Sequence, residues 1–152
     1  MKFSGTLISV KNIKASRKFY EDLFGLNVEF DFGANIAFDC GLYLQEGFAD
    51  FLEINENEIK YKTYNFELYF EEEKFDDFIF KLKEYKDIEY VHMVKEFSWG
   101  QRSIRIYDLD KHIIEIGESM VTVVKRFLAK GLSVEETSKI TQHPIDFVKK
   151  CI

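Results

Sequence analysis

The sequence contains little proline, cysteine or histidine and no long apolar run. Its 152 residues include one Pro, two Cys and three His. Cys40 and Cys151 form neither a Cys-x-x-Cys pair nor a disulfide framework, which is typical of a reduced cytosolic protein. No stretch approaches the ~18 apolar residues of a membrane span, and the first ten residues lack the apolar run of a signal peptide. We therefore expect a cytoplasmic protein with no membrane partner.

Aromatic and charged residues are plentiful. Hydrophobic residues make up 46% and charged residues 32% of the chain, which predicts a soluble globular protein with a sizeable core. The sixteen Phe and eight Tyr favour half-buried strands or a pocket for a flat ligand, although we expect most of them in the core. The net charge of −6 argues against nucleic acid as the partner of the whole chain.

Two halves of the chain show the same order of predicted elements. In the first half, a strand at 6–11 precedes a helix at 14–24, and strands follow from residue 26, at 36–39 and at 41–45. The second half has a strand at 64–70, a helix at 73–85 and strands at 88–94, 101–107 and 112–117. Residues 46–62 have no clear period and predict an irregular connection. We expect an α+β protein whose tandem βαβββ modules, about 1–62 and 63–118, bury their apolar faces on each other in a cupped mixed β-sheet.

A helical extension is predicted for residues 119–152. Its six basic and three acidic residues give it a charge of +3, so the first 118 residues carry −9. A helix at 119–130 ends at Gly131, and Ser133 and Glu136 form a capping box for a second helix. Pro144 suits the first turn of a third helix. The last two helices resemble a helix-turn-helix, but they also suit packing on their own sheet or on a dimer partner, because DNA-reading helices usually carry more Lys and Arg.

Residues 1–118 resemble the glyoxalase/bleomycin resistance/dioxygenase superfamily, also called the vicinal oxygen chelate fold. The opening motif is filled by Val10, Asn12, Ile13, Ser16, Phe19, Tyr20, Phe24 and Gly25. The closing hairpin of that family has an acidic turn and then an apolar-Glu-apolar strand. It is matched here by residues 108–111 and by Ile114-Glu115-Ile116. The resemblance implies the same cupped fold and commonly a homodimer.

The resemblance also implies four metal-ligand positions, and most of them lack a ligand. They fall on Gly5, Gln45 (or Glu46 in a shifted register), Asn65 and Glu115, and only Glu115 is of ligand type. Divalent transition metals prefer three or four imidazole, carboxylate or thiolate ligands. His92 is the only histidine whose strand could face the cup, and nothing at ligand spacing accompanies it. We therefore expect no catalytic metal and no other cofactor.

The remaining cup residues are polar and aromatic. If Asn65 faces inward, alternation along its strand brings Glu67 and Tyr69 to the same face. By the same alternation, Tyr43 lies on the same face as Gln45. Trp99 and Arg102 lie at the mouth of the last hairpin, where they could hold a ligand or only cover the core and pair with an acid. The candidate substrate-binding residues are thus Tyr43, Gln45, Asn65, Glu67, Tyr69, Trp99 and Arg102.

Three functions follow from these residues. The first is a glyoxalase/bleomycin-resistance-like protein that binds a small molecule, cationic or amphiphilic, without a catalytic metal. The second is a lyase or isomerase of the same superfamily, with Glu115 as catalytic base or as a residual metal ligand. The third is a regulatory or interaction protein acting through the C-terminal helices. The sequence does not decide whether the chain is an enzyme or which small molecule it binds.

Overall fold

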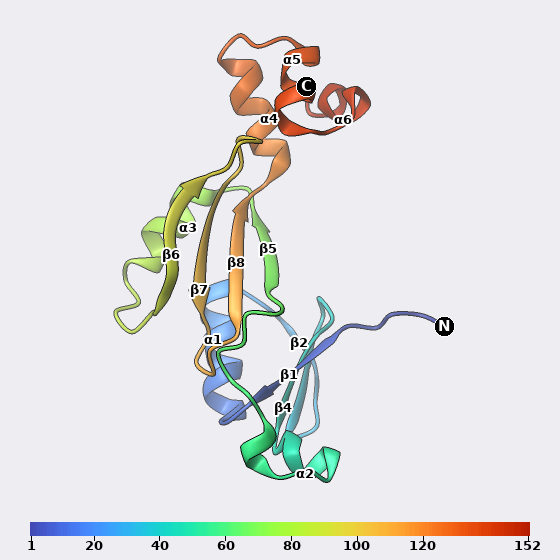
Figure 1. Cartoon of the computed structure of the whole chain (residues 1–152), viewed down its shortest axis with the longest axis vertical. Helices are drawn as coiled ribbons and strands as arrows, with labels where there is room; N and C mark the ends of the chain where they lie inside the picture. The colour runs from blue at the N-terminus through green and yellow to red at the C-terminus, as the bar shows by residue number, and fades with distance from the viewer. The chain divides into compact units, whose positions relative to one another are not determined.

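The computed structural model describes all residues, Met1–Ile152, and they form two compact units (Figure 1). Unit 1 contains residues 1–66 and 107–112, and unit 2 contains residues 67–106 and 113–152. Hydrogen bonds divide the eight strands into two four-stranded sheets with the orders β1-β4-β3-β2 and β5-β8-β7-β6. The identical order confirms the predicted duplication and the α+β class. None of the helices has both the length and the apolar character needed to cross a bilayer.

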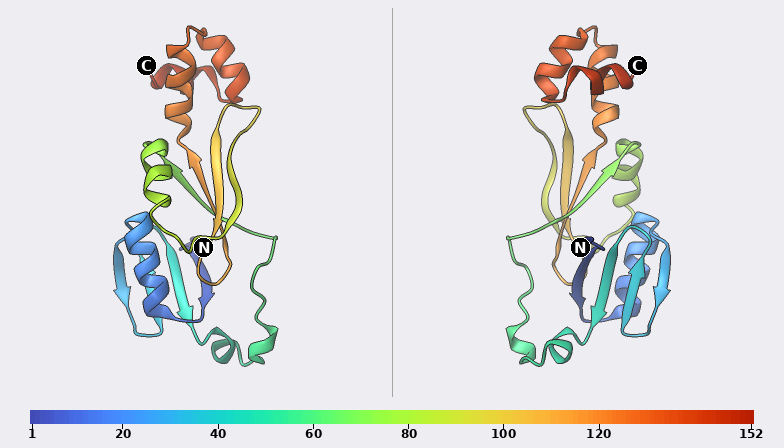
Figure 2. Two further views of the ribbon diagram at one scale, coloured as in Figure 1. Left: turned by 90° about the vertical axis from the view of Figure 1, so that its left-hand side faces the viewer. Right: turned by 90° about the vertical axis from the view of Figure 1, so that its right-hand side faces the viewer.

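The first sheet and one helix make up most of unit 1. Strand β1 is parallel to β4, and β3 is antiparallel to both β4 and β2. Helix α1 lies along one face of this sheet (Figure 2). The predicted irregular connection instead contains two short helices, α2 and η1. The elements are β1 (Thr6–Val10), α1 (Ile13–Phe24), β2 (Val28–Asp31), β3 (Asn35–Phe38), β4 (Leu42–Glu46), α2 (Phe48–Leu52) and η1 (Glu56–Glu58).

Helix α1 begins and ends where its sequence specifies. The Asn12 side chain accepts a hydrogen bond from the backbone N–H of Ala15, and Gly25 closes the helix at φ 67°. Phe19, Tyr20 and Leu23 point from the helix into the core and are 9% exposed or less. The apolar stripe read from the sequence is therefore the buried face of α1.

The turn at residues 107–112 is built around Asp108. Its carboxylate accepts hydrogen bonds from the backbone N–H groups of Asp110 and His112 and from the Tyr20 hydroxyl, the last at 2.8 Å. Burial and the nearby Asp108 carboxylate raise the pKa of Tyr20 well above its usual value. The turn predicted from its acidic residues is thus held by one buried carboxylate.

The second sheet has one helix on one of its faces, as the first does (Figure 2). Strand β5 is parallel to β8, and β6 is antiparallel to β7. Strand β5 begins at Leu68, four residues later than predicted. Leu68 is the first residue of this segment that pairs with β8, where it lies opposite Ile114. The elements are β5 (Leu68–Glu72), α3 (Phe75–Leu82), β6 (Tyr90–Glu96), β7 (Arg102–Tyr107) and β8 (Ile113–Glu118).

Three helices follow β8 within unit 2: α4 (Met120–Ala129), α5 (Val134–Thr141) and α6 (Ile145–Lys150). The predicted capping box is present, with Ser133 and Glu136 each bonded to the other's backbone N–H. Val124, Val148 and Cys151 form a small core at 7% exposure or less. The helical extension predicted from the sequence is confirmed.

Candidate functional site

The second sheet has an apolar face and a polar face, because side chains alternate along each strand. Four buried isoleucines, Ile104 and Ile106 of β7 and Ile114 and Ile116 of β8, form the apolar face, and α3 contributes Phe75, Phe78 and Leu82 to the same core. The opposite face, here called the polar face, takes side chains from all four strands and from the residue before β5. Its charged or polar members are Glu67, Tyr69, Glu71, His92, Lys95, Ser103, Arg105 and Glu115.

Arg105 is the centre of this face. Its Nε donates to Oε2 of Glu67 at 2.7 Å and its Nη2 to Oε1 of the same residue at 3.2 Å, which is a bidentate pair. The same Nη2 also donates to Oε2 of Glu115. One guanidinium therefore holds two carboxylates, one from the residue just before β5 and one from β8.

His92 completes the contacts of this guanidinium. Its Nε2 lies 3.0 Å from Nη1 of Arg105, and its Nδ1 lies 2.7 Å from the carbonyl oxygen of Met93. A guanidinium only donates and a carbonyl only accepts, so Nε2 accepts and Nδ1 carries the proton.

The two carboxyl groups have opposite pKa shifts. Burial raises the pKa of Glu115, whose side chain is 9% exposed, and the neighbouring Glu67 raises it further. The hydrogen bond from Arg105 lowers the pKa of Glu67. The buried hydroxyl of Ser103 has no partner at hydrogen-bonding geometry, but it lies close enough to Glu115 to oppose part of the increase. Such a separation of two carboxyl pKa values is typical of acid–base sites.

A hydrogen-bonded chain runs beside these charges. Trp99 Nε1 donates to Gln101 Oε1 at 3.1 Å, and Gln101 Nε2 donates to the Tyr69 hydroxyl at 2.9 Å. That hydroxyl in turn donates to Glu71 at 3.0 Å. Burial raises the pKa of Tyr69 to about 12. Gly117 makes room for this chain, since a Cβ there would lie 2.7 Å from Nε2 of Gln101.

Arg102 lies on the other face of the sheet. Its guanidinium lies 5.0 Å from the ring centre of Phe75 on α3 and forms ion pairs with Asp76 and Glu118. The sequence left open whether Arg102 holds a ligand or pairs with an acid, and in the structure it pairs with Asp76 and Glu118. One strand position separates the two faces, and the guanidinium on the polar face belongs to Arg105, three residues further along β7. Alternation along the strand could have separated the two arginines, because Arg102 shares its face with the buried Ile104 and Ile106.

Three other predicted site residues lie in unit 1. Tyr43 and Gln45 share the face of β4 that points away from α1, and Asn65 lies in an exposed bend before β5. The Gln45 side chain is engaged, because its Oε1 accepts from Asn35 and its Nε2 donates to a backbone carbonyl. Within unit 2 the structure brings together Glu67, Tyr69 and Glu115, with Trp99 linked through Gln101.

The residues present do not fit a divalent metal ion. Of the four positions implied by the family resemblance, Gly5 has no side chain, the Gln45 amide is hydrogen-bonded and Asn65 is an exposed amide. The shifted-register alternative, Glu46, accepts a hydrogen bond at 2.8 Å from the backbone N–H of Ile13. The carboxylate of Glu115 already binds a cationic group, the Arg105 guanidinium. Two amides and one paired carboxylate are a poor donor set for a transition metal.

Duplicated βαβββ sheets of this order, with a Glu on the last strand, define a glyoxalase-type fold. The sequence model of the glyoxalase-like domain matches residues 3–121, and the chain belongs to that family. No curated protein matches the chain. The matched region ends at the start of α4, so nearly all of the helical extension lies outside it.

Solved structures similar to this chain include the following three. A protein of unknown function from Agrobacterium tumefaciens str. C58 is 33% identical, with a TM-score of 0.68 over 78% of this chain and 94% of that one. A glyoxalase/bleomycin resistance protein/dioxygenase family enzyme from Burkholderia phytofirmans PsJN is 13% identical, with a TM-score of 0.66 over 78% and 98%. The fosfomycin resistance protein FosX from Listeria monocytogenes is 20% identical, with a TM-score of 0.58 over 78% and 93%. The last two establish the fold alone.

Proposed function

We propose that the protein binds a small cationic or amphiphilic organic molecule on the polar face of the second sheet, without a catalytic metal. The observation that carries this proposal is the contact between Arg105 and Glu115. A guanidinium bound to that carboxylate competes with a metal ion for the same oxygens. The site then recognises a ligand by charge, hydrogen bonds and aromatic contact.

The charge of the face favours a cation. Three carboxylates, Glu67, Glu71 and Glu115, outnumber the two basic side chains, Arg105 and Lys95. The half-exposed ring of Tyr69 supplies apolar contact beside the carboxylates. The rings of Phe97 and Trp99 are stacked with 4.6 Å between their centres, and they extend the aromatic surface near the end of the sheet. An amine attached to an aromatic or aliphatic body matches both features.

Thermal unfolding with three probes of similar size tests this proposal: phenethylammonium, 2-phenylethanol and phenylacetate. We expect phenethylammonium to raise the Tm most, with and without a chelator, because only the cation gains from the excess of carboxylates. Glu67→Gln and Glu71→Gln each remove one negative charge from the face and should weaken the effect. Glu53→Gln, an exposed change in unit 1, is the matched control. Equal stabilisation by all three probes, or by phenylacetate alone, would contradict the proposal.

The opposite pKa shifts of Glu67 and Glu115 favour one second function, that of a lyase or isomerase. A carboxylate with a raised pKa in a largely buried position suits a general base acting on an acidic C–H. Exchange of hydroxyacetone protons in D₂O, followed by ¹H NMR, tests this activity. Catalysed exchange that is lost in Glu115→Gln would support the base role, and exchange unaffected by that substitution would exclude it.

The remaining sequence predictions are proposals as well. A homodimer is tested by light scattering after size-exclusion chromatography, and a cytoplasmic location by fractionation of cells that express the protein. Action through the C-terminal helices is tested by comparing Lys149→Glu and Lys150→Glu with the unmodified chain for loss of DNA or protein binding. Both lysines lie exposed on α6.

A further inference from the structure

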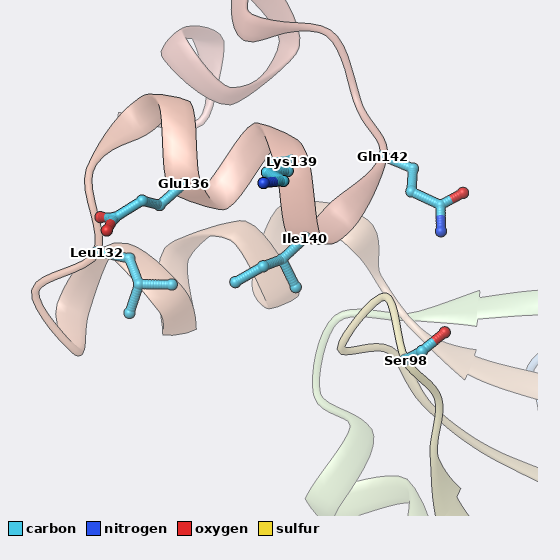
Figure 3. A pocket seen from close by; sticks show the side chains of 6 residues that line it. All are labelled: Ser98, Leu132, Glu136, Lys139, Ile140 and Gln142. Carbon is cyan, nitrogen blue, oxygen red and sulfur yellow. The ribbon is translucent and has the colours of Figure 1, made fainter.

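A cavity lies between helix α5 of the helical extension and the turn that joins β6 to β7 (Figure 3). Its volume is about 480 Å³, which lies in the range of small-molecule sites. Five of its lining residues belong to α5 or its flanking turns, and the sixth, Ser98, comes from the turn between β6 and β7. They are Ser98, Leu132, Glu136, Lys139, Ile140 and Gln142. All except Ser98 lie outside the region that matches the glyoxalase-like domain.

The walls of this cavity are held in place before any ligand binds. Gly100 in the β6–β7 turn packs so closely on α4 that a Cβ would lie 2.3 Å from the Phe127 ring. Arg126 on α4 donates a hydrogen bond to the carbonyl oxygen of Gly100 at 2.5 Å. On the other side, the backbone N–H of Leu132 bonds to the carbonyl of Phe127 at 3.3 Å. The turn that carries Ser98 and the loop that carries Leu132 are therefore both fixed to α4.

Most of the polar side chains around the cavity have no partner within the protein. The side chains of Lys139, Gln142 and Ser98 make no hydrogen bond or ion pair. The carboxylate of Glu136, by contrast, accepts from the backbone N–H of Ser133 at 2.8 Å and from its hydroxyl at 2.9 Å. In Figure 3 the carboxylate of Glu136 lies at the opposite end of α5 from Gln142. The uncommitted groups that can donate are thus an ammonium, an amide and a hydroxyl.

We propose that this cavity binds a small organic anion with an apolar body, such as an aliphatic carboxylate. The anionic end faces Lys139, with the amide of Gln142 and the hydroxyl of Ser98 as further donors. The apolar body lies over Leu132 and Ile140, the two half-buried aliphatic side chains of the lining. A ligand here contacts both α5 and the β6–β7 turn.

The only tryptophan of the chain reports on this site. Trp99 follows Ser98 directly, and its Nε1 is hydrogen-bonded to Gln101. A ligand in contact with Ser98 changes the surroundings of this one indole, so its fluorescence reports binding beside the β6–β7 turn, and substitution of Lys139 distinguishes this site from the polar face. Titration of the full-length protein with octanoate, followed by Trp99 fluorescence and by calorimetry, is the direct test.

We expect octanoate to bind saturably and 1-octanol and octylammonium to bind much more weakly. Lys139→Met should weaken octanoate binding about tenfold, as expected for the loss of one charge-assisted hydrogen bond. Lys125→Met is the matched control, because Lys125 is also an exposed lysine, on the neighbouring helix α4, and does not line the cavity. Ser98→Ala and Gln142→Ala should each have a smaller effect than Lys139→Met.

Three outcomes would overturn the proposal. They are no saturable octanoate binding, equal binding of 1-octanol, and equal weakening by Lys125→Met and Lys139→Met. Lys139 is exposed, so its substitution does not threaten folding, and circular dichroism verifies this. The test is independent of the sheet site, because the two sites are proposed to prefer ligands of opposite charge and Glu67→Gln should leave octanoate binding unchanged.

Discussion

Arg105 forms an ion pair with Glu115, the residue that the family resemblance identifies as a metal ligand. The same guanidinium binds Glu67 through two hydrogen bonds at 2.7 and 3.2 Å. A fixed organic cation therefore occupies one side of the only ligand-type residue among the four positions. This relationship is the physical basis for proposing a binding site that works without a metal ion.

The two glutamates that share Arg105 should affect stability with opposite dependence on pH. The pKa of Glu115 is raised above 4.5, so its contribution to stability is present below about 4.5 and is lost as pH rises through its folded-state pKa. The pKa of Glu67 is lowered below 4.5, so its contribution is present above about 4.5 and is lost as pH falls through its folded-state pKa.

Urea unfolding of Glu115→Gln and Glu67→Gln between pH 3 and 7 measures this difference. Relative to the unmodified protein, the free energy of unfolding of Glu115→Gln should increase as pH rises above about 4.5. That of Glu67→Gln should decrease over the range from its lowered pKa up to about 4.5. Parallel curves for the two variants would show that the pair does not divide its pKa values in this way.

Glu118 should be far more important for stability than Asp76, although both bind Arg102. The Glu118 side chain is 0% exposed and also binds Arg126 at 3.0 Å, whereas the Asp76 side chain is 78% exposed. Glu118→Gln should lower the free energy of unfolding by about 2–4 kcal/mol, because it removes the buried partner of two guanidinium groups. Asp76→Asn should cost less than about 1 kcal/mol. Similar losses in chemical denaturation would contradict this account.

Gly117→Ala should displace the hydrogen-bonded chain between Trp99 and Tyr69. The added Cβ would lie 2.7 Å from Nε2 of Gln101 and 3.1 Å from the Tyr69 ring, and Gly117 does not adopt a left-handed conformation. The substitution therefore tests the effect of the added methyl group without backbone strain. We expect a loss of about 1–3 kcal/mol in stability and a shift in Trp99 fluorescence. Unchanged fluorescence would mean that Gln101 does not connect these residues.

Divalent ions should leave the protein unaffected. Zn²⁺, Mn²⁺ and Ni²⁺ gain little from two amides and a carboxylate that is already paired. We expect the Tm to be the same with each ion and with a chelator, and elemental analysis of protein purified without chelator to find less than one metal per chain. A stoichiometric metal ion whose removal lowers the Tm would show that these residues do bind a divalent ion.

The sequence predicted the fold more fully than the site. Periodic Phe19, Tyr20 and Leu23, the cap residues Asn12 and Gly25, and the acidic turn at 108–111 each act through local chemistry that can be read from neighbouring residues. The duplication was visible because both halves repeat the same order of elements. The late start of β5 was not predicted, because it depends on pairing with β8, a strand about 45 residues further along the chain.

The contact that organises the site depends on strand register. Arg105 is separated in sequence from Glu67 by 38 positions and from Glu115 by 10. No local sequence pattern therefore indicates that these three residues meet. Alternation along β7 separates Arg105 from Arg102 and gave a usable signal, because Ile104 and Ile106 were the evident core residues. The proton position on His92 and the exposed positions of Phe30, Phe32 and Phe80 required the structure.

Calorimetric titration with phenethylammonium in the presence of a chelator shows directly whether the polar face binds a cation without a metal ion. It should compare the unmodified protein with Glu67→Gln and the exposed control Glu53→Gln. We expect saturable binding that the chelator does not affect, that Glu67→Gln weakens and that Glu53→Gln leaves unchanged. Binding that requires an added divalent ion, or that is the same in all three proteins, would contradict this expectation.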